Sequence, residues 1–401
     1  THRRSARTTE RVAVDDDRRG HTFGDAPTFA YPLLWSFGGA ETDNTGKKVI
    51  INGKGAEQAS LRVSEKVIGA LSRPFEIFGQ EIYIGASIGI VYFPGMGEDA
   101  HELIKNADMA MYQAKHEGRN RYKVFDHGMK AQVEESMALE IELRRATDAM
   151  DFFLHYQPKF DMQSGSIIGA EALIRWKVGE RMVSPALFIP VAEETGLIGA
   201  IGRWVFDTVC TQLRLWHDAF ELPPDFRVAV NMSVQQIQDA NLVHDLVQIM
   251  RERNVNNEWL ELEITESLLL ERTRENIERL MQIRDHGCGV ALDDFGTGYS
   301  SMGYLAQLPL TVMKIDKTFI DDIHRPQGSA ILSAVLALAK GLEVDVVAEG
   351  VETEDQAKGL LALGCRYAQG FYFAKPLSVT DVERLFESKF ARIRQKGSAT
   401  P

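Results

Sequence analysis

The chain has few cysteines and no long apolar run, and each shortage excludes a class of protein. Its three cysteines, Cys210, Cys288 and Cys365, are odd in number and far apart, and no CxxC pair is present. This pattern disfavours a disulfide framework and a zinc site, and it fits a reducing compartment. No run of about 18 apolar residues offers a membrane span, and no charged start with an apolar centre resembles a signal peptide. We therefore expect a soluble, cytoplasmic protein.

Basic residues are outnumbered by acidic ones, which limits the partners that the protein can bind. The 401 residues include 45 Lys and Arg against 57 Asp and Glu, a net charge of -12. A charge of this sign opposes nonspecific binding to DNA or to an anionic membrane, so we expect no nucleic-acid polymer as a partner. The length predicts two or three domains. Because the chain opens with Thr1 rather than Met, we expect that upstream segments could be missing.

The first third of the chain predicts a poorly patterned start followed by a small module. Residues 1–55 have little apolar periodicity, so we expect them to be disordered or the degenerate start of a domain. Apolar spacing then predicts helices over Ala56–Leu71 and Ala100–His116, with a strand pair over Glu81–Phe93. We assign residues 56–128 to a mixed α/β module.

A helical connector and a longer α/β region follow the module. Met129–Met150 has a helical charge pattern without Gly or Pro, which predicts a linker helix. Over 151–392 apolar or β-branched runs alternate with helical stretches, and 393–401 is a tail. The predicted strands are Ile167–Ile174, Arg227–Val230, Leu260–Ile264, Gly289–Leu292, Thr311–Ile315, Asp345–Ala348 and Tyr367–Phe373. The predicted helices include Gly202–His217, Val234–Arg253, Thr273–His286, Ala330–Leu342 and Asp355–Leu363.

This alternation predicts an α/β fold built on a parallel sheet. A region of roughly 250 residues suits a closed (β/α)8 TIM-like barrel. An open doubly wound sheet is the competitor, and it would need a Gly-rich phosphate turn after its first strand. Neither GxGxxG nor GxxxxGK[ST] occurs in the chain.

Polar side chains recur at or just beyond the ends of these strands. They are Glu171, Asn231, Glu263, Glu266, Asp293, Asp294, Lys314, Glu349 and Gln369. The carboxyl ends of parallel barrel strands open on one face, so these groups should converge there. Two unit charges about 4 Å apart repel by on the order of 4 kcal/mol at an effective dielectric constant near 20. Carboxylates crowded into one mouth must therefore take up protons or bind cations.

The chemistry of this set indicates two hard divalent ions. Carboxylates and an amide, with no Cys or His, suit Mg²⁺ or Mn²⁺ better than zinc. The adjacent pair Asp293 and Asp294 could help to hold two ions, one of them shared through Asp293. Two metals about 3.5 to 4 Å apart support in-line displacement at phosphorus. Lys314 could offset charge at the phosphorus or position the water, so the set predicts phosphodiester hydrolysis.

Each of these residues alone also has an ordinary structural explanation. A single Asp or Glu after a strand is more often a helix N-cap or a surface charge. Lys314 could pair with Asp316 or Asp293, and Asn231 could be a turn residue. What distinguishes the set is the recurrence of a suitable polar group after six or seven successive strands.

Ordered motifs carry a family resemblance across this region. They are YQP at Tyr156–Pro158, EALIRW at Glu171–Trp176, FIPVAEETGLI at Phe188–Ile198, NMS at Asn231, ELEITES at Glu261–Ser267, DDFGTGYSS at Asp293–Ser301, KID at Lys314, AEGVET at Ala348–Thr353 and QGFYFAKP at Gln369–Pro376. From about Leu154 to Leu385 the chain resembles the EAL domain phosphodiesterases, which hydrolyse the bacterial second messenger cyclic di-GMP. The resemblance implies a modified TIM barrel.

The resemblance also implies roles for individual residues. The implied metal ligands are Glu171, Asn231, Glu263, Asp293, Asp294 and Glu349. The implied catalytic residues are Glu349, Lys314 and Glu171, of which Glu349 and Lys314 would assist the attacking water. Gln157, Leu173, Arg175 and Gln369 would line the dinucleotide site. Glu266 would anchor the loop Asp294–Ser301, which couples the site to a homodimer interface of the EAL domain, and Glu352 would be a supporting carboxylate.

The earlier module carries two further motifs. SRPFEIFGQEIYIGASIGIVYFP and ADMAMYQAKHEGRNRYKVFD, which ends at Asp126, resemble the C-terminal half of a GGDEF (diguanylate cyclase) domain. Where that family has its signature loop, this chain has Gly38, Gly39, Ala40, Glu41 and Thr42, and the inhibitory RxxD motif before the loop is missing. A cyclase needs a carboxylate-held metal opposite the GTP phosphates, so Ala40 predicts an inactive, regulatory or vestigial module.

Three functional hypotheses follow. The leading one is hydrolysis of cyclic di-GMP to linear pGpG with two Mg²⁺ or Mn²⁺ ions. A second is a non-hydrolysing cyclic di-GMP receptor that signals through the linker helix, which the intact Glu171, Asp293 and Glu349 argue against. A third is a bifunctional cyclase and phosphodiesterase, which Ala40 and Thr42 argue against.

Overall fold

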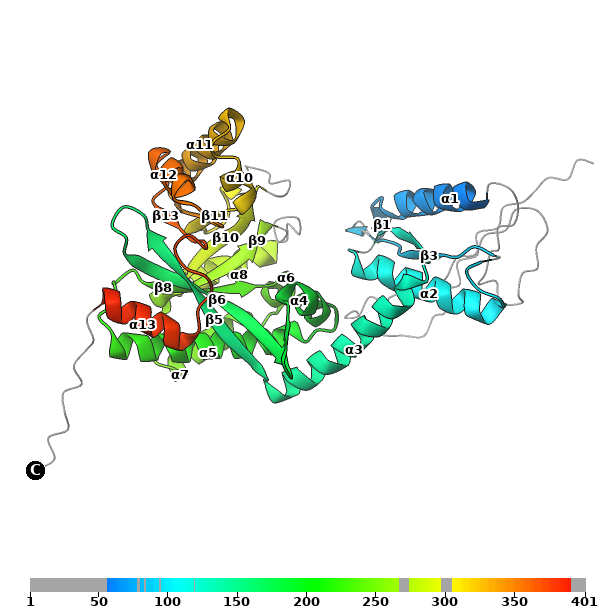
Figure 1. Cartoon of the computed structure of the whole chain (residues 1–401), viewed down its shortest axis with the longest axis horizontal. Coiled ribbons are helices and arrows are strands. Elements are labelled where there is room, and N and C mark those ends of the chain that lie inside the picture. Colours follow the sequence, from blue (N-terminus) through cyan, green and yellow to red (C-terminus); the bar gives the residue numbers. More distant parts are fainter. Residues whose placement is uncertain are drawn as a thin grey trace, which may run out of the picture. The chain divides into compact units, whose positions relative to one another are not determined.

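The structure is a computed structural model that describes most of the chain as two compact units. It describes residues 56–390 except 78, 79, 83, 94, 119, 267–273 and 297–304. The two units divide between Leu139 and Glu140 (Figure 1). The predictions for residues 1–55, for the signature loop at 38–42 and for the tail at 393–401 lie outside the described residues.

The described part of the first unit is a small α/β assembly with two short sheets. Its elements are α1 Ala56–Leu71, β1 Phe75–Ile77, β2 Gln80–Ile82, β3 Ile88–Ile90, α2 Ala100–His116 and β4 Tyr122–Val124. Both predicted helices are present. The predicted strand pair over Glu81–Phe93 is wrong, because β2 pairs antiparallel with β1 while β3 pairs in parallel with β4. A parallel pair needs a crossover connection, which α2 supplies between β3 and β4.

Close packing of α2 on β3 depends on one glycine. A Cβ atom at Gly89 would lie 1.9 Å from the Ala107 carbonyl oxygen on α2. The helix backbone therefore comes so near the strand that any side chain at Gly89 would force the two apart. Buried side chains complete this core, with Met109 and Ala110 of α2 packed beside Phe125 and Met129.

The predicted connector is a single helix, α3, over Gly128–Ala149. Met129 at its start is buried in the core of the first unit, and Leu143 and Ala146 near its end are buried in the second unit. The boundary between the units thus falls inside α3. Among the described residues no helix, α3 included, has the length and apolar character of a membrane span.

The second unit is a closed barrel of eight strands, as predicted. Its strands are β5 Phe152–Asp161, β6 Ile167–Val178, β8 Arg227–Met232, β9 Leu260–Thr265, β10 Gly289–Phe295, β11 Val312–Ile315, β12 Asp345–Ala348 and β13 Tyr367–Ala368. They pair in the order β6, β8, β9, β10, β11, β12, β13 and β5, and β5 closes the circle on β6. The short strand β7, Arg181–Val183, adds antiparallel to β6.

One barrel strand departs from the predicted parallel pattern. β5 is antiparallel to both of its neighbours, β6 and β13. The cause is local, because β5 and β6 are joined by a turn too short for a crossover, and such a turn imposes antiparallel pairing. In this turn Asp161 accepts a hydrogen bond from the Gln163 N–H at 2.9 Å, and Gly165 supplies the left-handed φ of 70°.

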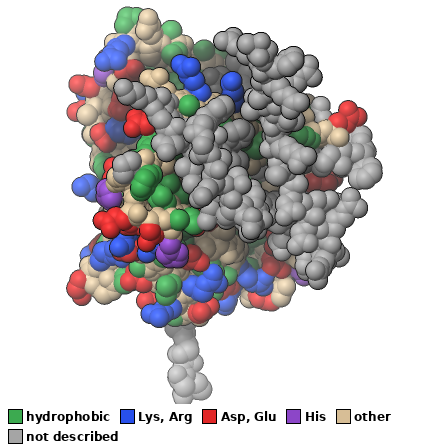
Figure 2. All heavy atoms as spheres, turned by 90° about the vertical axis from the view of Figure 1, so that its right-hand side faces the viewer, with side chains coloured by type: hydrophobic (Ala, Val, Ile, Leu, Met, Phe, Trp, Pro, Cys, Tyr) green, Lys and Arg blue, Asp and Glu red, His purple; other side chains and the backbone are tan. Residues whose placement is uncertain are grey.

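Helices cover the outside of the strands. Among the described residues they are α4 Pro185–Glu194, α5 Ile198–Ala219, α6 Val234–Gln238, α7 Leu242–Glu252, the 3-10 turn η1 Asn257–Trp259, α8 Arg274–Asp285, α10 Lys317–Asp321, α11 Pro326–Gly341, α12 Glu354–Ala362 and α13 Val379–Lys389. In Figure 1, α5 and α13 lie along one side of the barrel strands, and α11 and α12 lie along another. On the face shown in Figure 2, acidic and basic side chains of the described residues are interspersed.

Most predicted barrel elements differ from the structure by a few residues at their ends, and two differ more substantially. The predicted helix over Val234–Arg253 is two helices, because Asp239 adopts an extended conformation and its carboxylate accepts a hydrogen bond from the Asn241 N–H. Such a local side-chain bond offers the backbone an alternative to helix. The predicted strand over Tyr367–Phe373 ends at Ala368. Beyond it a Cβ atom at Gly370 would lie 2.2 Å from the Val351 carbonyl oxygen, so the chain turns tightly across the barrel end.

Candidate active site at the mouth of the barrel

Four carboxylates from separate strands surround the ammonium group of Lys314 on β11. Its Nζ atom lies 3.4 Å from Glu171 Oε2 on β6 and 2.8 Å from Glu263 Oε2 on β9. It also lies 3.2 Å from Asp293 Oδ1 on β10 and 2.7 Å from Glu349 Oε1, which follows β12. The parallel register of these strands brings together residues that are up to 178 positions apart, since each strand ends at the same rim.

Lys314 is the counter-charge at the centre of this group. Its side chain is 1% exposed, and burial alone would lower its pKa, but Glu171, Glu263 and Glu349 together raise the pKa well above the ordinary value. The lysine is therefore charged. The sequence allows Lys314 to pair with Asp293 or with Asp316. The pair with Asp293 is formed, whereas Asp316 caps α10 by accepting a hydrogen bond from the Thr318 N–H.

The carboxylates around Lys314 differ in their affinity for protons. Burial would raise the pKa of Glu171, but Lys314 and Lys159 outweigh it and lower that pKa to about 2. Burial raises the pKa of Glu263 to about 7, with the charge of Glu171 adding to the effect. Burial and the charge of Asp293 raise the pKa of Glu349 to about 8, although Lys314 opposes this. The site thus carries more negative charge than its lysines neutralise, and it favours uptake of a cation or a proton.

Three residues of the predicted ligand set bring their oxygens close enough together that they could hold a metal ion. One carboxylate oxygen each from Asp293, Asp294 and Glu349 lies within 4.8 Å of the others. Asp294 has a φ of 54°, a strained conformation for a residue with a side chain, and its N–H donates to Asp293 Oδ1 at 2.9 Å. Three oxygens from hard carboxylate groups suit Mg²⁺ or Mn²⁺.

The other predicted ligands lie beside this group. Asn231 on β8 donates from Nδ2 to Glu171 Oε1 at 2.8 Å, so these two form a pair. Glu263 is linked to the group through Lys314. All six predicted ligands therefore line one region of the barrel mouth, and Asp293, Asp294 and Glu349 are the three whose oxygens converge directly.

Two glutamines lie beside Glu171. Gln369 Nε2 donates to Glu171 Oε2 at 2.7 Å and to Gln157 Oε1 at 3.0 Å, and both glutamines are buried. Gln157 in turn donates to the Ala374 carbonyl oxygen at 3.1 Å. The buried Oε1 atom of Gln369 has no hydrogen-bond partner among the described residues, and such an atom favours an incoming donor. A pocket of about 210 Å³ opens here, lined by both glutamines together with Glu171, Lys314 and Glu349.

The other two predicted substrate residues line a second, larger pocket. Leu173 and Arg175 on β6 belong to a cavity of about 720 Å³ that also contains Asn231 and is bounded by α4, α5 and α6. Arg175 is half-buried, and its guanidinium donates to the Ile174 carbonyl oxygen at 2.9 Å. The predicted substrate residues therefore fall on two pockets, and Glu171 lines the smaller one.

Comparisons with known proteins agree with this geometry. Residues 140–376, more than half of the chain, match the family described as EAL domain. The chain belongs to the EAL domain family. Residues 49–121 match the family described as Diguanylate cyclase, GGDEF domain, so the GGDEF match precedes the EAL domain.

Two curated relatives of the chain have names that refer to cyclic di-GMP phosphodiesterases. The chain is 42% identical over 324 residues to the bifunctional diguanylate cyclase/cyclic di-GMP phosphodiesterase MucR of Pseudomonas aeruginosa, a match that covers 80% of this chain and 47% of MucR. It is 36% identical over 385 residues to the cyclic di-GMP phosphodiesterase PdeR of Escherichia coli, covering 94% of this chain and 58% of PdeR. The chain thus spans about half the length of the curated relatives that it matches.

Solved structures resemble the EAL barrel. The phosphodiesterase PaMucR in complex with c-di-GMP is 40% identical, with a TM-score of 0.58, and the match covers 61% of this chain and 99% of that one. The EAL enzyme Bd1971 in its cAMP- and cyclic-di-GMP-bound form is 31% identical, with a TM-score of 0.60, and the match covers 64% of this chain and 70% of that one.

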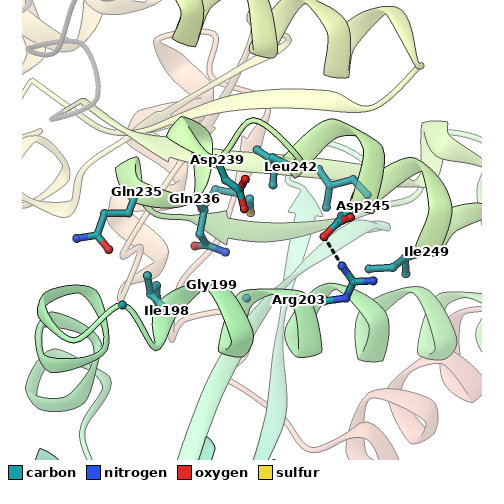
Figure 3. Close-up of a pocket in the computed structure, with 13 residues that line it drawn as sticks. Ile198, Gly199, Arg203, Gln235, Gln236, Asp239, Leu242, Asp245 and Ile249 are labelled. Atoms are coloured by element: carbon teal, nitrogen blue, oxygen red, sulfur yellow. Dashed lines mark hydrogen bonds and ion pairs between the residues drawn. The ribbon is translucent and has the colours of Figure 1, made fainter. Parts of the chain in front are cut away.

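A third pocket of the EAL barrel lies apart from the carboxylates. It has a volume of about 160 Å³ and is lined by α5, α6 and α7. Figure 3 shows Gln235, Gln236 and Asp239 on one side of it, and Arg203 donating to Asp245 on the other. None of the predicted site residues lines this pocket, so it is no part of the carboxylate centre.

The two predicted supporting carboxylates have different surroundings. Glu266, just after β9, accepts a hydrogen bond at Oε2 from the Gly296 N–H at 3.0 Å. This contact holds the start of the loop that follows Asp294, and residues 297–304 of that loop lie outside the described part of the chain. Glu352 is exposed at the rim, where its Oε1 pairs with Lys317 Nζ at 3.2 Å. The coupling of this loop to a dimer interface stays a prediction.

Two charged residues inside the EAL barrel, Lys159 and Glu261, were not predicted from the sequence. Lys159 Nζ lies 2.8 Å from Glu261 Oε1 and 2.9 Å from Glu263 Oε1, and all three side chains are buried. A usable signal was present, because Glu261 and Glu263 are two residues apart on one apolar strand and so share a face. Lys159 was overlooked because β5 was not among the predicted strands.

Proposed function

We propose that the EAL barrel hydrolyses cyclic di-GMP to linear pGpG with two divalent ions, Mg²⁺ or Mn²⁺. The observation that carries this proposal is the convergence of Asp293, Asp294 and Glu349 oxygens within 4.8 Å of one another beside Glu171 and Lys314. Membership of the EAL domain family and similarity to relatives named as cyclic di-GMP phosphodiesterases support the same substrate and reaction.

The proposed ion ligands are the predicted set. They are Glu171, Asn231, Glu263, Asp293, Asp294 and Glu349. Bound divalent ions would make an attacking water more acidic and withdraw charge from the phosphodiester. The protein's own contribution is to hold these oxygens in place through the rigid barrel strands and through the Asn231 to Glu171 hydrogen bond of 2.8 Å.

Lys314 and Glu349 are proposed to position and activate the attacking water. Their side chains form an ion pair of 2.7 Å, so a water that reaches one is within reach of the other. Glu349 can accept a proton from the water at a carboxylate oxygen. The Lys314 ammonium can donate a hydrogen bond to the phosphate oxygen on which negative charge builds up. Lys314 Nζ lies 3.2 Å from Asp293 Oδ1, and a Glu349 oxygen lies within 4.8 Å of an Asp293 oxygen. Both groups could therefore act on the same phosphate.

The substrate is proposed to lie across β6, with the scissile phosphate near Glu171. Gln157 and Gln369 would bind one side of it in the 210 Å³ pocket. Arg175 would contact a phosphate, because its planar guanidinium matches the oxygens of a phosphate group, and Leu173 would supply an apolar contact. The smaller pocket, which Glu171 lines, and the larger pocket, which Leu173 and Arg175 line, would receive the two halves of the dinucleotide.

The GGDEF-like part is proposed to be inactive as a cyclase, with a regulatory or vestigial role. Ala40 stands where the family needs an acidic residue, and this carries the proposal. Conversion of GTP to cyclic di-GMP by the purified chain would contradict it. A homodimer through the EAL domain is proposed from the family resemblance alone, and the molar mass in solution tests it.

Incubation of the purified chain with cyclic di-GMP and Mg²⁺ or Mn²⁺, followed by chromatographic separation of nucleotides, tests the proposed hydrolysis. We expect pGpG from the wild type and none from Glu171→Ala. Glu180→Ala is the matched control, since Glu180 is a fully exposed glutamate in the turn that follows the same strand. Absence of product from the wild type would contradict the proposal. Tight binding of cyclic di-GMP without turnover would instead favour the non-hydrolysing receptor.

A further inference from the structure

Lys159 lies inside the barrel beneath the carboxylate site. It is on β5, the antiparallel strand, where Gln157 pairs with Glu171 and Lys159 pairs with Gly169. Because β5 runs opposite to its neighbours, each step along it leads deeper into the barrel, away from the rim. Lys159 is therefore below Gln157, and its side chain is only 6% exposed. A charged group at such depth must be held by partners of opposite charge.

Glu263 is shared between two lysines, one on each oxygen. Its Oε1 atom lies 2.9 Å from Lys159 Nζ, and its Oε2 atom lies 2.8 Å from Lys314 Nζ. The two oxygens of a carboxylate point in different directions, so these contacts define how the group is turned. Oε2 faces the cluster around Lys314, and Oε1 faces down the barrel toward Lys159. The Glu263 side chain is completely buried, and water does not compete for either contact.

We propose that Lys159 is a positioning residue of the EAL site, which holds Glu263 by Oε1 and so presents Oε2 to the divalent ions. The proposal rests on the metal-dependent function proposed above. Carboxylates that ligate metals are in turn hydrogen-bonded by neighbouring groups, and loss of such a group typically reduces metal affinity about 10- to 100-fold. Lys159 would act through Glu263 and would not touch the substrate.

A purely structural role for Lys159 makes a different prediction. Lys159 also pairs with Glu261 Oε1 at 2.8 Å, and Glu261 is outside the predicted ligand set. If neutralising Glu261 were its only task, the removal of both residues would leave the metal site unchanged. If Lys159 positions Glu263, the same double removal would still weaken metal binding.

The test compares Mn²⁺ binding by the full chain and its variants, measured by isothermal titration calorimetry without substrate. The double variant Lys159→Met/Glu261→Met removes both buried charges, and Lys159→Gln keeps a neutral donor. We expect Mn²⁺ affinity to fall about 10- to 100-fold in the double variant and less in Lys159→Gln. The Mn²⁺ concentration for half-maximal turnover should rise in parallel, while KM for cyclic di-GMP at saturating Mn²⁺ changes less than about threefold.

Glu261→Gln is the matched control, because it removes the second partner of Lys159 and leaves the contact with Glu263. It should keep Mn²⁺ affinity within about threefold of the wild type. A folded double variant with unchanged Mn²⁺ affinity would overturn the proposal, as would an equal loss in Glu261→Gln. If thermal unfolding shows that neither Lys159 variant folds, the residue serves the fold and the proposal is also overturned.

The outcome for Lys159 is separable from the outcome for the proposed function. A wild type that binds Mn²⁺ but leaves cyclic di-GMP intact would refute the hydrolysis, and the comparison of affinities would still decide the role of Lys159. Hydrolysis by the wild type with equal Mn²⁺ affinity in the folded double variant would refute the positioning role alone. A wild type that binds no Mn²⁺ would overturn both.

Discussion

Lys314 on β11 and Glu349, just beyond the neighbouring strand β12, form the shortest described ion pair of the barrel mouth, with 2.7 Å between Nζ and Oε1. The backbone fixes this relationship, because the Glu349 N–H donates to the Ile315 carbonyl oxygen at 3.0 Å and so continues the β11 to β12 ladder by one residue. The Glu349 carboxylate, one residue beyond the end of β12, thus faces Lys314, one residue before the end of β11. This arrangement makes the lysine central to both the electrostatics and the proposed chemistry.

Replacement of Lys314 by Met should therefore affect stability and activity together. Four carboxylates would lose a buried counter-charge, and breaking a buried ion pair by removing one partner typically costs about 3 to 5 kcal/mol. We expect a lower melting temperature in EDTA, partial recovery with Mg²⁺, and no measurable hydrolysis. Lys358→Met, which breaks the exposed pair with Glu354, should change the melting temperature far less, because exposed ion pairs contribute little to stability. Equal melting temperatures for both variants would contradict the central role of Lys314.

Loss of a single proposed ligand should abolish hydrolysis. We expect Glu263→Gln or Asp293→Asn to reduce turnover of cyclic di-GMP more than about a thousandfold, since several kcal/mol of charge stabilisation is lost with the ligand. Steady-state assays over a range of Mg²⁺ concentrations measure this. Activity that survives either change would mean that the residues are wrongly assigned.

Calcium should inhibit hydrolysis while it preserves substrate binding. Ca²⁺ binds oxygen at longer distances and with less regular geometry than Mg²⁺. The oxygens of Asp293, Asp294 and Glu349, which lie within 4.8 Å of one another, would therefore hold Ca²⁺ without placing the attacking water correctly. Competition assays with Mg²⁺ held constant and Ca²⁺ increased measure the inhibition, and binding of cyclic di-GMP is followed separately. Turnover with Ca²⁺ equal to that with Mg²⁺ would contradict the expectation.

The sequence predicted the convergence of the site, and the structure explains why this was possible. Glu171, Asp293 and Glu349 each lie at or after an apolar run, and a parallel barrel brings such strand ends to one rim. The direction of β5 was not predicted, because it depends on a short turn and not on the apolar pattern. Lys159 was missed for a related reason, since its partner Glu261 is 102 residues away and only the closed barrel brings them together.

Close packing in the first unit provides a test that leaves the EAL barrel intact. Alanine at Gly89 would place Cβ 1.9 Å from the Ala107 carbonyl oxygen, and the backbone of α2 would have to move. Overpacking of this kind costs about 1 to 3 kcal/mol. We expect faster amide hydrogen exchange in α2 and β4 of Gly89→Ala and unchanged exchange in the barrel strands. Gly69→Ala is the matched control, because no described residue has an atom within 4 Å of its added Cβ. Equal exchange in both variants would contradict the close approach.

The pair formed by His217 and Trp259 predicts a loss of barrel stability in acid. Their rings stack with centroids 3.4 Å apart, and burial together with the charge of Arg214 lowers the pKa of His217 from 6.5 to about 4. The folded state therefore binds this proton less readily than the unfolded state. The stability is complete above pH 6.5 and declines as the pH falls toward 4, where the unfolded histidine is already protonated.

His217→Phe should remove this part of the pH dependence, because phenylalanine can stack on Trp259 and cannot take up a proton. Since His217 is only half-buried, solvent reduces the effect, and we expect a difference on the order of 1 kcal/mol between pH 7 and pH 4.5. Urea unfolding of wild type and variant at both pH values, followed by tryptophan fluorescence, measures it. A wild type and variant that lose the same stability between these pH values would show that the His217 pKa is not lowered in the folded state.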